Sequence, residues 1–194
     1  MANQNQSPKI TVVALVENEP GVLNRIASLF RRRGFNIDSL TVGRTHKPHV
    51  SRMTIRVDAD PEYAKRIATN LHKLVNVIDV RILDNEPHLV RDLALIKVRN
   101  DDAESRNTIT EICERYPARI IDVGPKVAIL EMVGTEEILE RFIEEVRQVG
   151  IVEMIRTGLV AMGRGTLIHD TEFKRPDTGT PKPDIHSNGN GRII

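Results

Sequence analysis

Apolar and polar residues follow two different periods in the first half of the chain, and each change of period marks a new element. The nearly continuous apolar run from Ile10 to Val16 predicts a buried strand. The strict alternation over Arg52–Val57 predicts a strand with one solvent-exposed face. Helical spacing predicts a helix that begins at Val22 and is closed by Gly34, and another that opens at Asp60-Pro61. Two further strands are expected, one with Ile37, Leu40 and Val42 and one with Ile78, Val80 and Ile82.

The resulting order of strand, helix, strand, strand, helix and strand is the split βαβ, ferredoxin-like plan, with both helices on one face of an antiparallel sheet. After a polar linker at 84–88 the same order starts again with a strand at Leu93–Val98, and we expect Thr135 to cap its second helix. We therefore expect an α+β protein with two tandem ferredoxin-like βαββαβ domains, at 9–84 and 90–169. The two halves share architecture rather than sequence.

The last segment, 170–194, has a different composition from the rest of the chain. Pro and Gly are frequent in it, and its polar residues show no period. Such a segment cannot bury enough apolar surface to offset its conformational entropy. We expect a disordered tail.

Charge and composition exclude several classes of protein. The chain has 28 Lys+Arg against 27 Asp+Glu and no Trp, so it lacks the charge and the stacking residues of a dedicated nucleic-acid binder. No apolar run approaches the ~18 residues needed to span a membrane, and the polar N-terminus does not resemble a signal peptide. The single cysteine, Cys113, lies on an apolar helix stripe and fits a reducing cytoplasm. These features predict a cytoplasmic protein.

Familiar catalytic motifs are absent from the sequence, including a P-loop, a dinucleotide glycine fingerprint and a nucleophile elbow. His46 and His49 form an i, i+3 pair that suits either a metal or, more commonly, a solvated turn. The three arginines at 31–33 either bind phosphate or complement the dipole at a helix C-terminus. We expect no catalytic apparatus and no metal in this chain.

The segment from Asn18 to Leu23, where the first strand meets the first helix, is the best candidate for a binding site. Gly21 allows a ligand to approach the backbone, and the free N–H groups of the first helical turn favour a carboxylate. Asn18 and Asn36 supply amides that both accept and donate hydrogen bonds. We expect Asn36 to lie at the same end of the sheet, so that the site suits an apolar amino acid. The alternative is an ordinary helix start with Asn18 as a turn residue.

Several motifs resemble the ACT domain of acetolactate synthase (acetohydroxyacid synthase) regulatory small subunits. The resemblance covers about residues 9 to 169 and is most specific in two stretches of the first domain. The motifs that carry it are Glu17-Asn18-Glu19-Pro20-Gly21-Val22-Leu23, Asn36-Ile37-Asp38-Ser39-Leu40-Thr41-Val42, Ser51-Arg52-Met53-Thr54, Leu71-His72-Lys73-Leu74-Val75 and Arg119-Ile120-Ile121-Asp122-Val123.

This resemblance implies a non-catalytic chain that binds and activates a larger catalytic subunit and confers feedback inhibition by valine or another branched-chain amino acid. Thiamine diphosphate, Mg²⁺ and FAD are then expected on the catalytic partner, which makes acetolactate from pyruvate. The resemblance also implies a homodimer through the ACT domains with the effector between protomers. Asn18 and Gly21 of one copy would face Asn36 of the other, with Val22, Leu23 and Ile37 close by.

Two other classes of function are open at this point. Tandem sensor domains also occur in amino-acid-responsive transcriptional regulators, but the sequence shows no helix-turn-helix or basic arm outside the two domains. A small enzyme that uses His46 and His49 is the third possibility. A gel-shift and a metal analysis distinguish these classes from a regulatory subunit.

Overall fold

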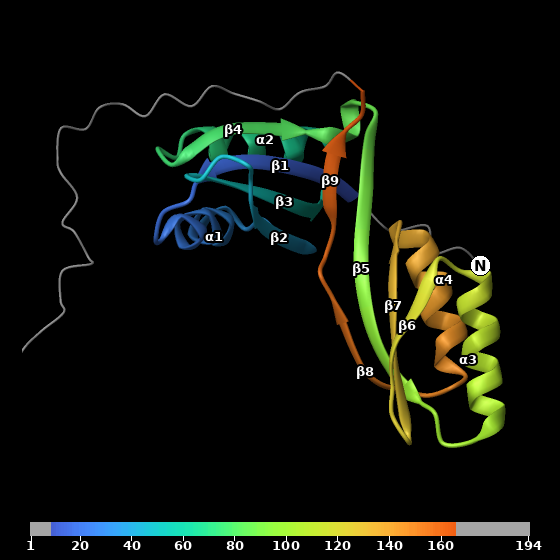
Figure 1. Ribbon diagram of the computed structural model, residues 1–194. Coiled ribbons are helices and arrows are strands. Elements are labelled where there is room, and N and C mark those ends of the chain that lie inside the picture. The colour runs from blue at the N-terminus through green and yellow to red at the C-terminus, as the bar shows by residue number, and fades with distance from the viewer. Residues whose placement is uncertain (1–8, 166–194) are drawn as a thin grey trace, which may run out of the picture.

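Two antiparallel sheets, each with a pair of helices on one face, make up residues 9–165, which are the residues that this computed structural model describes (Figure 1). In the first sheet the strands lie in the order β2-β3-β1-β4. This arrangement confirms the predicted ferredoxin-like plan. Its elements are β1 (Lys9–Glu17), α1 (Val22–Arg33), β2 (Ser39–Arg44), β3 (Val50–Asp58), α2 (Pro61–His72) and β4 (Val77–Ile82).

The first core lies between this sheet and its helices. Every second residue of β1 faces α1 and α2, and Ile26 and Phe30 of α1 close the layer with 1% and 2% of their surface exposed. Burying one such large side chain is worth roughly 1.5–3 kcal/mol. The continuous apolar run of β1 is explained by its opposite face, because Val13 is also buried there, against the second domain.

The second domain repeats the plan, with strands in the order β6-β7-β5-β8 and a separate core around Phe142. Cys113 packs against this core, and burial raises the pKa of its thiol. The predicted cap is present, since the Thr135 hydroxyl accepts from the Ile138 N–H. The elements after the first domain are the short 3₁₀ helix η1 (Leu83–Asn85), β5 (His88–Arg99), α3 (Ala103–Arg115), β6 (Ala118–Val123), β7 (Val127–Gly134), α4 (Glu136–Arg147) and β8 (Ile151–Arg156).

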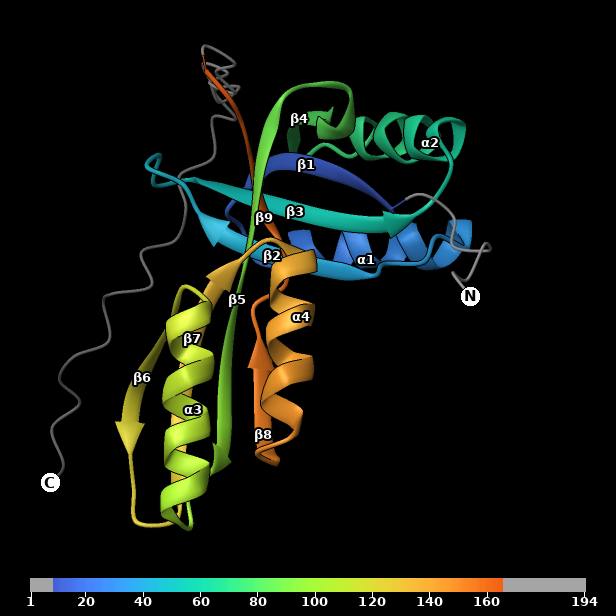
Figure 2. The ribbon, with the colours of Figure 1, turned by 90° about the vertical axis from the view of Figure 1, so that its right-hand side faces the viewer.

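A two-stranded ribbon that the sequence did not predict joins the domains. β5 is longer than expected, and its first residues, His88–Arg91, pair with a further strand, β9 (Val160–Gly163). The ribbon crosses the face of the first sheet that carries no helices (Figure 2). Ala161 and Val90 of the ribbon pack there with Val13 of β1 and Leu83. The first sheet is therefore covered on both faces, by its helices and in part by the ribbon.

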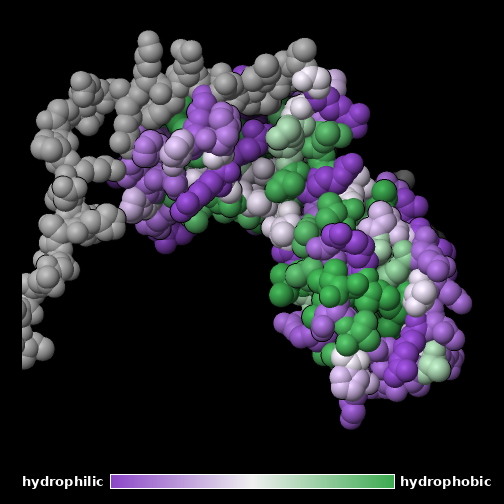
Figure 3. All heavy atoms as spheres, viewed as in Figure 1, coloured by the Kyte–Doolittle hydropathy of each residue, from purple (hydrophilic) through white to green (hydrophobic). Residues whose placement is uncertain are grey.

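The second sheet keeps apolar side chains at its surface. Figure 3 shows them gathered over the region of β5, β7 and β8. Val133 and Ile155 are among the large exposed ones. Ion pairs lie on the strands of the same sheet, between Lys97 and Glu153 and between Arg119 and Glu131. No helix within residues 9–165 is long and apolar enough to cross a membrane. The expected tail, 170–194, lies outside the described residues, as does the end of the second domain after residue 165.

Candidate functional site

The N-terminus of α1 differs from that of the other three α-helices in residues 9–165. α2, α3 and α4 begin with Asp60, Asp102 and Thr135, whose side chains each accept from a backbone N–H of the first turn. α1 begins with Gly21 at φ +83°, has no side-chain cap and carries no acidic residue in its first turn. Only glycine adopts this left-handed conformation without strain, so Gly21 both starts the helix and leaves its amides uncovered.

Free amide donors therefore point out of this helix end. The Val22 N–H reaches the Glu19 carbonyl at 3.4 Å, and the first regular helical bond runs from the Arg25 N–H to the Gly21 carbonyl at 3.0 Å. Within residues 9–165 the N–H groups of Leu23 and Asn24 have no hydrogen-bond partner. Together with the positive end of the helix dipole, two such donors suit a carboxylate.

Asn18 lies beside this helix end, as the sequence predicted. Its backbone N–H donates to the His49 carbonyl at 2.8 Å. Its exposed side-chain amide has no hydrogen-bond partner in the described part of the chain. The amide group is thus available to a ligand that needs both a donor and an acceptor. Of the two apolar candidates nearby, Val22 is buried in the first core, whereas Leu23 is 49% exposed. Leu23 is the one that a ligand can contact.

A polar network behind the site was missed by the sequence analysis. The Asn76 side chain donates to Glu17 at 2.6 Å and accepts from Arg25 at 2.6 Å, which ties β1, α1 and the start of β4 together. Asn76 lies 59 residues from Glu17 in sequence, and no local pattern marks such a pair. The network therefore links the first turns of α1 to the end of β1.

Asn36 lies at the opposite end of the first sheet, so the expectation that it shares an end with Asn18 is wrong within one chain. α1 has 12 residues, which corresponds to about 18 Å of rise, and Asn36 follows its C-terminal end. The next strand, β2, runs parallel to β1 because both pair antiparallel with β3. The start of β1 accordingly lies near this segment, with Lys9 Nζ 3.2 Å from Asp38.

The side chains around Asn36 divide between core and solvent. Ile37 packs against the first core, while Asn36 is exposed and its side chain has no partner within residues 9–165. One protomer thus presents the Asn18 and Gly21 half of the predicted site at one end of the sheet and the Asn36 half at the other. The two halves can meet only if they come from different chains.

The other candidate residues lie outside this site. His46 and His49 are exposed in the turn between β2 and β3, and the described residues contain no group of three or more His, Cys, Asp or Glu placed to hold a metal. The three arginines at 31–33 occupy the last turn of α1, where they complement the helix dipole. The four α-helices of residues 9–165 all belong to the two βαββαβ units, so none of them forms a separate DNA-reading module.

Family models match both halves of the chain. One described as an AHAS small subunit-like ACT domain matches residues 13–79. One described as the small subunit of acetolactate synthase matches residues 91–165. Together they cover nearly all the residues that the structure describes.

Whole-chain comparisons agree with the family models. The chain is 46% identical over 157 residues to a probable acetolactate synthase small subunit of Archaeoglobus fulgidus, covering 81% of this chain and 98% of that protein. It is 42% identical over 161 residues to the acetolactate synthase small subunit of Mycolicibacterium smegmatis, covering 83% and 94%. The crystal structure of the small subunit from Thermotoga maritima superposes with a TM-score of 0.76 at 39% identity, covering 82% and 99%. The chain belongs to the acetolactate synthase small-subunit family.

Proposed function

We propose that this protein binds and activates the catalytic subunit of acetolactate synthase and makes it sensitive to valine or another branched-chain amino acid. Membership of the family makes the chain the regulatory, non-catalytic part of an enzyme of branched-chain amino-acid biosynthesis. The observation that carries the effector proposal is the uncapped N-terminus of α1 beside the unpartnered amide of Asn18.

Each group of this site has a counterpart on a branched-chain amino acid. The free N–H groups of Leu23 and Asn24 would bind the carboxylate. The side-chain carbonyl oxygen of Asn18 would accept a hydrogen bond from the ammonium group. The exposed Leu23 side chain would pack against the aliphatic part of the amino acid. Since a zwitterion carries no net charge, these dipolar groups can recognise it without a charged side chain.

A homodimer supplies the missing half of the site. β2 lies at one edge of the first sheet, and no strand of the described residues pairs with its outer edge. If two β2 strands pair antiparallel about a two-fold axis, the start of β2 in one chain lies beside the end of β2 in the other. The end of β2 is also the end at which β1 leads into Gly21, because the two strands are parallel. Such a dimer would bring Asn36 of the partner subunit toward Asn18 and complete two equivalent sites.

The chemistry of the enzyme would belong to the catalytic subunit. That subunit would hold thiamine diphosphate, Mg²⁺ and FAD, and would condense two pyruvates to acetolactate or pyruvate with 2-oxobutyrate. We place the assembly in the cytoplasm.

Reconstitution with the catalytic subunit of the same organism tests the proposal directly. The rate of acetolactate formation is measured with and without this chain, and then over a valine titration. We expect higher activity with the chain present and inhibition by valine only in its presence. An enzyme whose rate and valine response are the same with and without the chain would contradict the proposal. A gel-shift with genomic DNA, in which we expect no shift, covers the alternative of a transcriptional regulator.

A further inference from the structure

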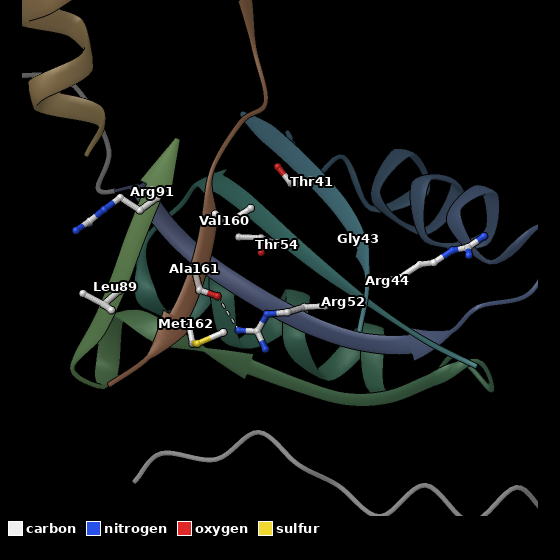
Figure 4. Close-up of a pocket in the computed structure, with 10 residues that line it drawn as sticks. All are labelled: Thr41, Gly43, Arg44, Arg52, Thr54, Leu89, Arg91, Val160, Ala161 and Met162. Carbon is white, nitrogen blue, oxygen red and sulfur yellow. Dashed lines mark hydrogen bonds between the residues drawn. The ribbon is translucent and has the colours of Figure 1, made fainter. Parts of the chain in front are cut away.

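A cavity of about 380 Å³ lies between the helix-free face of the first sheet and the ribbon of β5 and β9 (Figure 4). Thr54 and Gly43 line it from β3 and β2, and Ala161 and Met162 line it from β9. Its volume lies within the range of about 300–1,000 Å³ that is usual for small-molecule sites. It lies on the face of the sheet opposite to α1, so it is separate from the effector site proposed above.

Arg52 of β3 places a positive charge in this cavity without a counterion. Its Nη2 donates to the Ala161 carbonyl at 2.7 Å, and within residues 9–165 it has no acidic partner. Arg56 on the same strand and Arg156 in the second domain both pair with carboxylates. Arg52 is half-buried, and this partial removal from water lowers the pKa of its guanidinium. A partly desolvated cation with free N–H groups is stabilised by an anion.

The other lining groups select the kind of anion. The ribbon contributes apolar side chains, among them Val160 and Met162, and no acidic residue lines the cavity in the described part of the chain. Arg44 and Arg91 also line it, with their guanidinium groups turned away from Arg52 (Figure 4). Nothing here would neutralise an ammonium group, so a ligand with a single negative charge and an aliphatic body fits better than a zwitterion.

The strand pairing leaves room beside Arg52. Gly43 of β2 lies directly opposite Arg52 in the register with β3. A Cβ built on Gly43 would meet no heavy atom within 4 Å, so the wall of the cavity is open at this position of β2. A bidentate carboxylate on an arginine needs such space, because both oxygens must approach the planar fork.

We propose that this cavity binds a small aliphatic monocarboxylate, with the carboxylate on Arg52 and the aliphatic chain against the β9 side of the ribbon. The walls come from both domains, so a bound ligand would favour the arrangement in which the ribbon covers the first sheet. The proposal goes beyond the regulatory function and uses neither Asn18 nor Asn36.

The experiment is calorimetry on the full purified chain with 3-methylbutanoate, with its neutral analogue 3-methylbutanamide and with valine. We expect saturable binding of 3-methylbutanoate at one site per chain. The amide should bind at least about tenfold more weakly, because it loses the charge-assisted hydrogen bonds to Arg52. To separate this cavity from the α1 site, the valine titration is repeated with the cavity filled by 3-methylbutanoate, and the affinity for valine should change less than about threefold.

Two variants test the location. Gly43→Val adds a side chain into the open space of the cavity and keeps Arg52, so it should abolish binding of 3-methylbutanoate. Arg52→Gln should weaken binding by about tenfold or more. Arg44→Gln is the matched control, since it removes a charge at the rim and should change affinity less than about threefold. Circular dichroism melts verify that each variant is folded.

These binding measurements test the cavity independently of the effector site. Binding that Gly43→Val abolishes and Arg44→Gln retains supports it. Absence of saturable binding to the parent chain, equal binding of acid and amide, or undiminished binding to Gly43→Val overturns it. Should Arg52→Gln fail to fold, Gly43→Val alone decides. The regulatory function is tested separately, by the valine response of the enzyme reconstituted with the parent chain, so a failure here leaves that function standing.

Discussion

Lys9 bridges the two domains by pairing with Glu136, with its Nζ 3.0 Å from the carboxylate at the N-terminus of α4. The same Nζ lies 3.2 Å from Asp38, two residues after Asn36. Arg56 of the first sheet adds a second, longer contact to Glu136 at 3.7 Å. A continuous set of ion pairs therefore connects the segment of Asn36, where the proposed effector binds across the dimer, with the second domain.

Removing the Asn36 amide should abolish feedback inhibition at ordinary valine concentrations. Asn36→Ala loses a hydrogen bond to a charged group of the effector, which is worth about 1.5–3 kcal/mol. The affinity for valine should fall roughly 10- to 150-fold, while activation of the catalytic subunit persists. A valine titration of the reconstituted enzyme measures this shift, with Asn107→Ala on α3 as the control. An unchanged inhibition curve for Asn36→Ala would mean that the pocket lies elsewhere.

A charge at position 21 should block the effector for a different reason. Gly21→Asp puts a carboxylate next to the free amides of α1, where we expect the carboxylate of valine. Gly21→Asn has nearly the same shape, carries no charge and tolerates the left-handed conformation better than most residues. Calorimetry with valine should show a much larger loss of affinity for the Asp variant than for the Asn variant. Equal losses would attribute the effect to the backbone rather than to charge.

Local patterns predicted the elements that depend on neighbours in sequence. The apolar run of β1, the helix that ends at Gly34 and the cap at Thr135 are all confirmed, because each is determined by residues a few positions apart. β9 was missed because it has four residues and pairs with β5, more than 60 positions away. The cavity around Arg52 was missed for the same reason, since it exists only where the two domains meet.

The position of Asn36 was wrong for a reason that the sequence already contained. A helix that connects two parallel strands returns across the sheet, so the second strand starts at the end where the first one started. The 12 residues of α1 span that distance and separate Asn18 from Asn36. The geometry of a single chain thus makes the dimer a requirement of the proposed site.

Adding charge to the edge of β2 should prevent the dimer. Val42 is 45% exposed on this edge strand, and Val42→Glu would place two carboxylates near the two-fold axis of paired β2 strands. Light scattering after size exclusion should show a dimer for the parent chain at micromolar concentration and a shift toward monomer for the variant. Val75→Glu is the control, since Val75 is 91% exposed between α2 and β4. A parent chain that is monomeric with and without valine would exclude a site shared between chains.

Breaking the bridge between the domains should uncouple effector binding from inhibition. Glu136→Gln removes the charge that Lys9 and Arg56 share and leaves the polar atoms at the proposed effector site in place. We expect valine to bind the isolated chain with nearly the affinity of the parent, while maximal inhibition of the reconstituted enzyme decreases. Glu137→Gln, the next residue of α4, carries an exposed carboxylate that pairs only with Arg141 within residues 9–165, and it should behave as the parent does.

The pH dependence of the Lys9–Glu136 ion pair follows from the direction in which the pKa of Lys9 is shifted. Hydrogen bonding to Glu136 raises the pKa of Lys9 above its ordinary value, so the ammonium form is favoured in the folded chain. The stabilisation is then complete below the pKa of the unfolded state and is lost only as the pH rises through the higher folded value. Between pH 7 and about 9 the coupling should be constant, and added salt should weaken it, because Lys9 and Glu136 are both partly exposed. Two results would show that the coupling between effector binding and inhibition does not pass through Lys9. One is a steep decrease of valine inhibition between pH 7 and 9 in the parent. The other is equal valine inhibition in the parent and in Glu136→Gln.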